Sequence, residues 1–348
     1  MNKIYLLTDY KGRFGSKHDD QPYRSGMDLS LLKKCFKEIG YESEPVSFSD
    51  VNLCDSFWSG SLVLYTSSED IGLIYKQYIE DIVLSLSLAG AEVIPRFEFL
   101  RANNNKVFME LLRCILPEDM RGNLVSSHYG TLEELTAGKG EIEYPVVVKG
   151  FSGAMGRNVF LAHNEKELKK TIRKKVLSES PLRFRIKEYL RQVRHKGYRR
   201  DSFYRGRFVV QKFVPGLKND WKVYFFGNKA FVFYRPIFAE RVFRASGGGY
   251  DNYLYGRDAD IPEGMLDFGW KLFRQLRVPN ISMDIAWDGV RFYLLEFQCI
   301  YFGTAGILRK YSSEYWLRKN DSWELNDNDG CIEKVYAESI GWFMENEG

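Results

Sequence analysis

Two acidic side chains lie on neighbouring apolar segments between residues 281 and 298, and such a pair could hold a cation. The region reads as two β-strands joined by an Asp-Gly hairpin signal at 288. Asp284 stands in the first strand and Glu296 in the second, and Gln298 shares the face of Glu296 because strand side chains alternate. A carboxylate on an apolar strand is costly unless an opposite charge offsets it. Hard oxygen ligands of this kind suit Mg²⁺, which leaves its other positions to water and nucleotide phosphates.

The length of the hairpin loop decides whether the two acids share a face. A two-residue loop at Asp288-Gly289 pairs Asp284 with Tyr293 and sends Glu296 to the opposite face, whereas a three-residue loop restores the parity. We favour the odd-numbered loop or a bulge, because both place the acids together. The alternative is a charged pair on a solvated face of the sheet.

A glycine-rich loop preceded by a lysine forms a second candidate site. Residues 144–149 read as a buried strand ending at Lys149, and 158–162 read as a second strand after the loop. Glycines let backbone N–H groups approach phosphate oxygens closely, and Lys149 could bridge those oxygens. No Gly-Lys-Ser/Thr follows and the loop joins strand to strand, so it is not a Walker loop.

The same loop superficially resembles the glycine loop of protein kinases. Asp267-Phe268-Gly269 would supply the matching metal motif. However, the sequence contains no His-Arg-Asp catalytic loop, and the apolar spacing over 265–276 predicts a helix. We therefore interpret the Asp-Phe-Gly tripeptide as a coincidence.

Taken in order, these segments resemble the ATP-grasp superfamily. The resemblance covers roughly residues 100–310 and rests on the Lys149 strand, the glycine loop, the segment 211–216, and the acids at 284 and 296. It implies a mixed α/β and α+β fold. A Rossmann-like pre-ATP-grasp domain would span 1–100, a small lobe with a basic insertion would span 101–215, and a large lobe with the Mg²⁺ site and a C-terminal helix would span 216–348.

The resemblance also implies roles for individual residues. Lys106 and Lys149 resemble the two phosphate-contacting lysines, and Asp220 resembles a ribose-side acid. The implied ATP-binding residues are Lys106, Lys149, Ser152, Gly153, Ala154, Met155, Gly156, Gln211, Lys212, Phe213, Val214 and Asp220. Two Mg²⁺ ions, for which Mn²⁺ can substitute, would be held by Asp284, Glu296 and Gln298, the last standing where Asn is commoner. The implied catalytic residues are Lys222, Arg235, Arg244 and Ser246, with Arg235 stabilising the transferred phosphoryl group and the 244–249 loop lying near the acceptor.

The chemistry that the resemblance implies is carboxylate activation. Phosphoryl transfer needs positioning and cations aimed at developing negative charge, so a substrate carboxylate would attack the γ-phosphate and an amine would open the acyl phosphate to an amide. The implied substrates are a small or polymer-linked carboxylate, such as a uronic acid of a surface polysaccharide, and an amine. Alternatives are a ligase that modifies a peptide or protein, and a non-catalytic ATP-binding regulator.

The first hundred residues alternate between strand and helix patterns. Strands are predicted at 3–8, 43–48, 61–66 and 92–95, and helices at 27–39 and 75–88. Such alternation indicates a mainly parallel sheet whose strand ends collect ligands. We expect residues 9–24 and 67–69 to lie at that edge and to select the acceptor substrate, the alternative being ordinary connecting loops.

Residues 183–207 carry a local excess of positive charge. Ten Lys and Arg face only Glu188 and Asp201, so the segment has a net charge of +8 whereas the rest of the chain sums to −4. Such a patch could attract an anionic substrate, an acidic leader peptide or, with its interleaved aromatic residues, a nucleic acid. Nucleic acid is disfavoured because no binding motif accompanies the charge. The other alternative is a solvated insertion.

Composition places few other constraints. The 348 residues are 45% hydrophobic, enough for two or three packed units. The five cysteines are scattered without Cys-x-x-Cys spacing, which indicates neither zinc nor disulfides and favours the cytoplasm. We expect no signal peptide, and no apolar run approaches the ~20 residues of a membrane span. A dimer is compatible with the sequence, which leaves the oligomeric state open.

Overall fold

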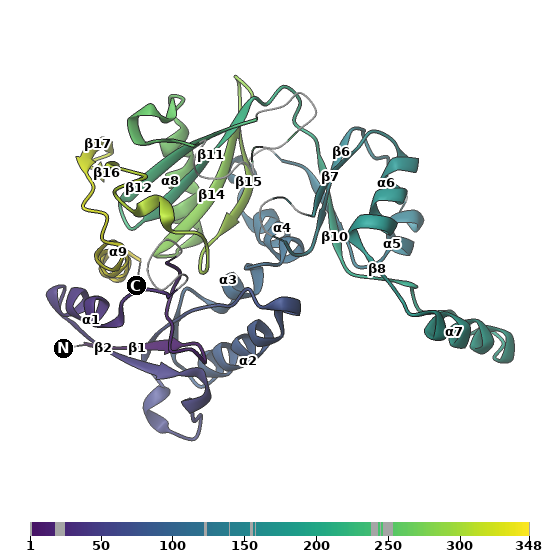
Figure 1. Ribbon diagram of the computed structural model, residues 1–348, viewed down its shortest axis with the longest axis horizontal. Helices are drawn as coiled ribbons and strands as arrows, with labels where there is room; N and C mark the ends of the chain where they lie inside the picture. The colour runs from purple at the N-terminus through teal and green to yellow at the C-terminus, as the bar shows by residue number, and fades with distance from the viewer. Residues whose placement is uncertain are drawn as a thin grey trace.

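The computed structural model contains three units, each of which is built on a β-sheet (Figure 1). The structure describes residues 2–17, 25–121, 124–138, 140–153, 156, 158–237, 243, 245 and 253–347. No helix in this part of the chain is long and apolar enough to cross a membrane.

The N-terminal unit is a four-stranded parallel sheet with the order β2-β1-β3-β4. Its elements are β1 (Asn2–Thr8), α1 (Leu29–Glu38), β2 (Tyr41–Ser47), β3 (Leu62–Tyr65), α2 (Ile74–Leu88), β4 (Glu92–Ile94) and α3 (Phe97–Ala102). All four predicted strands and both predicted helices are confirmed. Because the strand order reverses between β1 and β3, the loops that follow these strands diverge and leave room for a ligand.

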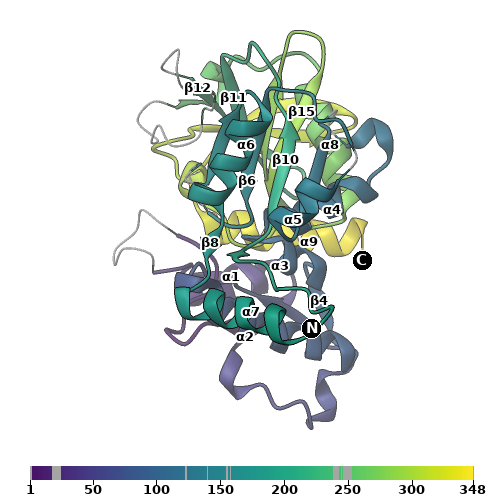
Figure 2. The ribbon, with the colours of Figure 1, turned by 90° about the vertical axis from the view of Figure 1, so that its right-hand side faces the viewer.

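The small lobe is an antiparallel sheet with the order β5-β10-β6-β7. Its elements are α4 (Lys106–Ile115), β5 (Ser126–Tyr129), α5 (Leu132–Ala137), β6 (Val146–Gly150), β7 (Val159–Ala162), α6 (Glu165–Thr171) and β10 (Phe208–Lys212). Apolar residues of α5 and α6 pack on the sheet and form the core of the lobe. An arm extends from this lobe. Its strands β8 (Ser178–Glu179) and β9 (Tyr204–Arg205) pair with each other, and the chain between them forms helix α7 (Leu182–Arg194) (Figure 2).

The large lobe is a seven-stranded antiparallel sheet that carries the predicted acids. Its elements are β11 (Asn219–Phe226), β12 (Lys229–Pro236), β13 (Leu254–Tyr255), α8 (Met265–Leu276), β14 (Asn280–Trp287), β15 (Phe292–Gln298), β16 (Glu314–Lys319) and β17 (Ser322–Asp327). The predicted helix over 265–276 is confirmed as α8. Within it, Asp267 accepts hydrogen bonds from Arg318 and Trp323, so this carboxylate anchors β16 and β17 to the helix.

The C-terminal helix α9 (Ile332–Asn346) joins the large lobe to the N-terminal unit. Apolar residues of α9, including Ile340 and Phe343, share one buried cluster with Phe36 of α1 and Phe226 of β11. The predicted packing helix at 332–344 is thus confirmed. The domain boundaries at 100 and 215 remain predictions, and this shared core ties the first and the last of the three predicted domains together.

We expect Glu333→Ala to destabilise the protein strongly. The buried Glu333 carboxylate lies 2.9 Å from Lys17 Nζ and accepts a hydrogen bond from the backbone N–H of Asp28, the N-cap of α1. Removing it breaks a buried ion pair and a hydrogen bond that join α9 to the N-terminal unit, which costs about 3 kcal/mol. Thermal unfolding measures the effect, with the exposed Glu345→Ala on the same helix as control. Equal melting temperatures in the two variants would contradict this link.

Candidate active site

Asp284 and Glu296 are directly paired across the hairpin formed by β14 and β15. The turn is not the predicted odd-numbered loop, because Asp288 N–H donates to Arg291 O and Trp287 pairs with Phe292. That geometry alone would place the acids on opposite faces. The register shifts by one residue between Asp284 and Ile285, so a bulge puts both acids on one face, as the bulge alternative predicted.

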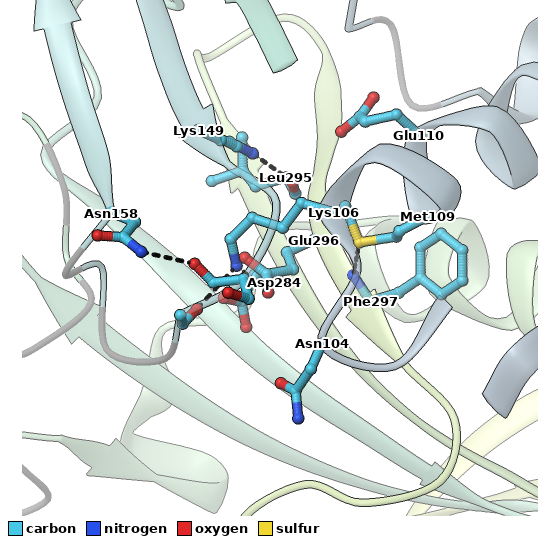
Figure 3. Close-up of polar contacts among 12 residues, drawn as sticks. Asn104, Lys106, Met109, Glu110, Lys149, Asn158, Asp284, Leu295, Glu296 and Phe297 are labelled. Carbon is cyan, nitrogen blue, oxygen red and sulfur yellow. Dashed lines mark hydrogen bonds and ion pairs between the residues drawn. The ribbon is translucent and has the colours of Figure 1, made fainter. Parts of the chain in front are cut away.

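Lys106 connects the acid pair to the glycine loop. Its Nζ donates to Glu296 Oε1 at 2.8 Å and to the carbonyl of Gly153 at 3.1 Å (Figure 3). The backbone N–H of Lys106 also donates to Phe151 O at 2.7 Å, so the first turn of α4 is bonded to the start of the loop. Asn158 closes the other side of the loop by donating to Ser152 O at 2.8 Å. The structure therefore brings Lys106, the glycine loop and the predicted metal ligand Glu296 together.

Lys149 is buried at the centre of the site. Its Nζ donates to the carbonyl of Leu295, the residue inserted by the bulge, at 2.9 Å. Burial lowers the pKa of this ammonium, although the carboxylates of Glu110 and Glu296 partly offset the effect. A buried cation with a neutral carbonyl as its close partner is prepared to bind an additional anion, such as a phosphate group.

Arg235 lies between two carboxylates on the large-lobe sheet. Its Nε donates to Asp220 Oδ1 at 2.5 Å, and its Nη2 lies 2.9 Å from Asp284 Oδ2. Lys222 approaches the second acid from the neighbouring strand, with Nζ 3.2 Å from Asp284 Oδ1. The cross-strand register explains the cluster, since Asp220 pairs with Arg235 and Lys222 pairs with Asp284.

The charges in this cluster shift one another's pKa values in different directions. Burial raises the pKa of Asp284, but Arg235 and Lys222 more than compensate, so the carboxyl group has a pKa well below its usual range. Burial dominates at Asp220 and raises its pKa in spite of Arg235. The two acids therefore raise the pKa of the Arg235 guanidinium against the effect of burial. Asp284 is the acid that stays ionised and able to bind a cation.

A pocket lies between the two lobes, beside these residues. Its lining is mainly apolar, with polar groups at one end, as expected of a site for a small molecule. Eight predicted site residues line the pocket: Lys149, Gln211, Lys212, Phe213, Val214, Asp220, Asp284 and Glu296. Val147 and Leu295, which neighbour them in the sheets, also line it. Residues 211–214, which the resemblance implies in ATP binding, therefore border this pocket. Gln211 is held in place by donating to Glu110 Oε1 at 3.2 Å.

Several predicted residues lie elsewhere or cannot be placed. Ala154, Met155, Arg244 and Ser246 lie outside the described residues. Gln298 follows Glu296 on β15, pairs with Ser282 and is half-buried. Lys212 borders the pocket, but its exposed ammonium pairs with Glu143 at 2.7 Å.

The donor set fits a magnesium ion that shares its ligands with phosphate. Asp284 and Glu296 are partly exposed to the pocket, and cross-strand partners of this kind lie about 5 Å apart. Among the residues that the structure describes, no three Asp, Glu, His or Cys side chains form a complete metal site. Mg²⁺ commonly takes one or two carboxylates and completes its shell with water and nucleotide phosphates, so two acids and an amide are sufficient.

Three important partners were missed at the sequence level. Glu110 orients Gln211 and also pairs with Arg113, while Asn158 holds the loop and Leu295 O accepts from Lys149. The contacts of Glu110 with Gln211 and of Lys149 with Leu295 O join residues distant in the chain, and the contact of Asn158 depends on a backbone carbonyl.

A second pocket lies at the carboxyl ends of β1 and β3. It is lined by the predicted acceptor loops, including Lys11, Arg13, Ser67 and Glu69, and by Tyr301 beyond the end of β15. Asn104, beside the Lys106 helix, donates to Glu69 Oε1 at 3.5 Å. This contact places the loops of the second pocket beside the helix that carries Lys106.

Comparison with known proteins supports the fold. No protein-family model and no curated protein matches the sequence, whereas many solved structures match its fold. D-cycloserine synthetase DcsG aligns over 98% of this chain and 99% of its own, with 11% identity and a TM-score of 0.52. The VanG D-Ala:D-Ser ligase from Enterococcus faecalis aligns over 98% and 99%, with 12% identity and a TM-score of 0.50. An ATP-grasp RimK domain protein from Sphaerobacter thermophilus covers 97% and 98%, with 15% identity and a TM-score of 0.49.

The chain therefore has the ATP-grasp fold, and the resemblance predicted from the sequence is confirmed at the level of the fold. The N-terminal parallel sheet precedes the two antiparallel lobes, in the predicted order.

We expect Lys149→Met to stabilise the protein while weakening ATP binding. Burial places the folded-state pKa of Lys149 below its unfolded value of about 10.4, so the charged side chain costs stability at neutral pH. Methionine should raise the free energy of unfolding at pH 7, and this gain should shrink as pH rises toward the unfolded pKa. Loss of a charge-assisted phosphate contact should weaken ATP binding by about tenfold or more.

Denaturant unfolding and calorimetric titration with ATP measure the two effects. The exposed Lys174→Met serves as the control and should change neither. A variant that binds ATP as tightly as the wild type would show that Lys149 does not contact the nucleotide.

Proposed function

We propose that this protein is an ATP-dependent carboxylate–amine ligase that forms an amide through an acyl phosphate. The observation that carries the proposal is the position of β15 between two pockets. Leu295 and Glu296 line the pocket beside Lys149, while Tyr301, just beyond the strand, lines the pocket of the N-terminal loops. A nucleotide in the first pocket and an acid in the second would bring their reacting groups to the same strand end.

The residues around β15 match what phosphoryl transfer requires. The acid's carboxylate oxygen attacks the γ-phosphorus, the bond to the β-phosphate oxygen breaks, and ADP leaves. Lys149 and Lys106 supply positive charge where the γ-phosphate would lie, and Arg235 keeps Asp284 ionised and oriented. Mg²⁺ bound at Asp284, Glu296 and Gln298 would neutralise charge on the phosphates.

Amide formation completes the reaction. The amine nitrogen attacks the carbonyl carbon of the acyl phosphate, inorganic phosphate leaves, and the nitrogen releases a proton. This sequence needs no side-chain nucleophile. Two structural neighbours with TM-scores of 0.52 and 0.50 are named as a synthetase and a ligase, which supports this class of reaction.

The second pocket favours an acid that carries hydroxyl groups. Lys11 and Arg13 provide cations for a carboxylate, and the Arg13 side chain has no ion pair among the described residues. Ser67 is buried in the pocket wall, and its Oγ lacks a hydrogen-bond partner in that part of the structure. The exposed Tyr10 adds an aromatic face. A uronic acid, free or within a polysaccharide, combines the carboxylate and hydroxyls that these groups would bind.

ADP release with Mg²⁺-ATP tests the proposed reaction. We expect turnover with a pool of uronic acids and amines, and none in Glu296→Ala, because that variant lacks one of the two metal-binding carboxylates. Turnover only with acidic peptides would replace the uronic acid by a peptide substrate. If ATP binds without turnover in any pool, the protein is an ATP-binding regulator instead of a ligase.

Arg13→Ala tests the acceptor pocket separately. Loss of one charged contact to the substrate carboxylate should raise the KM for the acid by about tenfold or more, while the KM for ATP stays the same. Steady-state kinetics at saturating ATP measures the change. The exposed Lys34→Ala on α1, which lines neither pocket, is the control. An unchanged KM for the acid in Arg13→Ala would exclude this pocket as the carboxylate site.

A further inference from the structure

The arm formed by residues 178–205 carries helix α7 away from the rest of the molecule. Its stalk is the short β8–β9 pair, in which Ser178 faces Arg205 and Glu179 faces Tyr204. In Figure 1 the helix lies beyond the small lobe, with no other element of the described chain beside it. Neither pocket described above includes a residue of this helix. The arm is therefore not explained by the active site.

One face of α7 is apolar and exposed along its whole length. At 100° per residue the exposed apolar side chains fall within an arc of about 100°, a continuous stripe along the helix. The stripe consists of Leu182, Ile186, Tyr189, Leu190 and Val193, which are between 52% and 71% exposed. Isolated exposed apolar residues are normal on a protein surface, but an aligned stripe of five on one helix marks a contact surface.

The opposite face of α7 is already used within the arm. Glu188 is buried and pairs with Arg191 at 2.6 Å, and it accepts hydrogen bonds from Tyr198 Oη and Asp201 N. These contacts hold the segment after the helix against that face. The hydrogen bond from Tyr198 is the main cause that lowers the pKa of Glu188, so the acid stays ionised. The return segment therefore fixes the helix and leaves the apolar stripe uncovered.

Basic side chains border the apolar stripe. On the helical wheel Arg183, Lys187 and Arg194 follow one edge of the stripe, whereas Arg185 on the other edge is paired with Glu179 at 2.6 Å. The helix carries no acid except Glu188, which is buried by its own partners. Long basic side chains at the edges of an apolar stripe can direct their charges to lipid head groups while their stems lie on the acyl boundary.

We propose that α7 docks this protein onto an anionic lipid surface, with the apolar stripe entering the head-group boundary and the flanking basic residues contacting lipid phosphates. Charge complementarity favours this occupant. Residues 183–207 carry +8 whereas the remainder of the chain carries −4, so an anionic surface attracts the arm and repels the rest. Arg183, Lys187 and Arg194 line one edge of the stripe, so a flat anionic plane that receives the stripe meets three cations along that edge. This docking does not depend on the proposed ligase reaction.

Vesicle flotation with the full-length protein tests the proposal. The protein should float with vesicles of phosphatidylcholine and phosphatidylglycerol, stay behind with phosphatidylcholine alone, and dissociate as salt is raised. Replacing Arg183 and Arg194 by Gln should weaken binding by about thirtyfold. Ile186→Ser with Val193→Ser should weaken it by about tenfold or more.

Matched controls separate docking from general charge and folding. Lys166→Gln with Lys170→Gln removes two exposed cations from α6 and should leave binding unchanged. All variants should keep the melting temperature and the ATP affinity of the wild type, because the changed side chains are exposed and distant from the pockets.

Three results would overturn the proposal. One is failure of the wild type to float with the anionic vesicles, which would assign the stripe to a protein or peptide partner. Another is full binding by the Ile186→Ser/Val193→Ser variant, which would show simple charge attraction without insertion. The third is a wild-type protein that is oligomeric in light scattering and an Ile186→Asp variant that is monomeric, because a second copy of the chain would then cover the stripe.

Discussion

Pairing of buried charge is the constraint on which the site depends. Asp220 and Asp284 lie within an apolar sheet, and neither could stay there ionised without Arg235 between them. Glu296 is balanced by Lys106 in the same way. The protein thus supplies its own cations to the acids that would bind a metal, so the acids are already oriented before any ligand arrives. Because Lys106 also holds Gly153 O, the charge balance of the acids is coupled to the position of the glycine loop.

The single residue that the bulge inserts, Leu295, has two structural consequences. It moves Glu296 onto the face of Asp284, and it turns a carbonyl toward the ammonium of Lys149. Without it, the even-numbered turn would direct the second acid into the opposite core and leave the buried lysine without its neutral partner. A β-bulge next to a functional site changes the direction of side chains in this way. The geometry of the acids and that of the lysine therefore change together.

Local pattern was enough to predict most of the elements but not the partners within the site. The strands of the N-terminal sheet, the Lys149 strand, α8 and α9 can all be recognised from local apolar runs or apolar periodicity. The shared face of the two acids was predicted, but not which residue is inserted, since a bulge depends on how two strands pair. Glu110 and Leu295 act through contacts with residues about one hundred or more positions away, and no local pattern encodes such contacts.

The architecture separates chemistry from selection. Residues that would handle phosphate come from the two lobes and converge on β15, whereas the second pocket is built by loops after β1 and β3. Loops at a reversal of strand order can change without disturbing the sheet that supports them. The arm adds a third function that neither pocket requires. If the acid belongs to a polymer assembled at a lipid surface, an anionic bilayer under α7 would raise its local concentration near the site, with no change to the reacting groups.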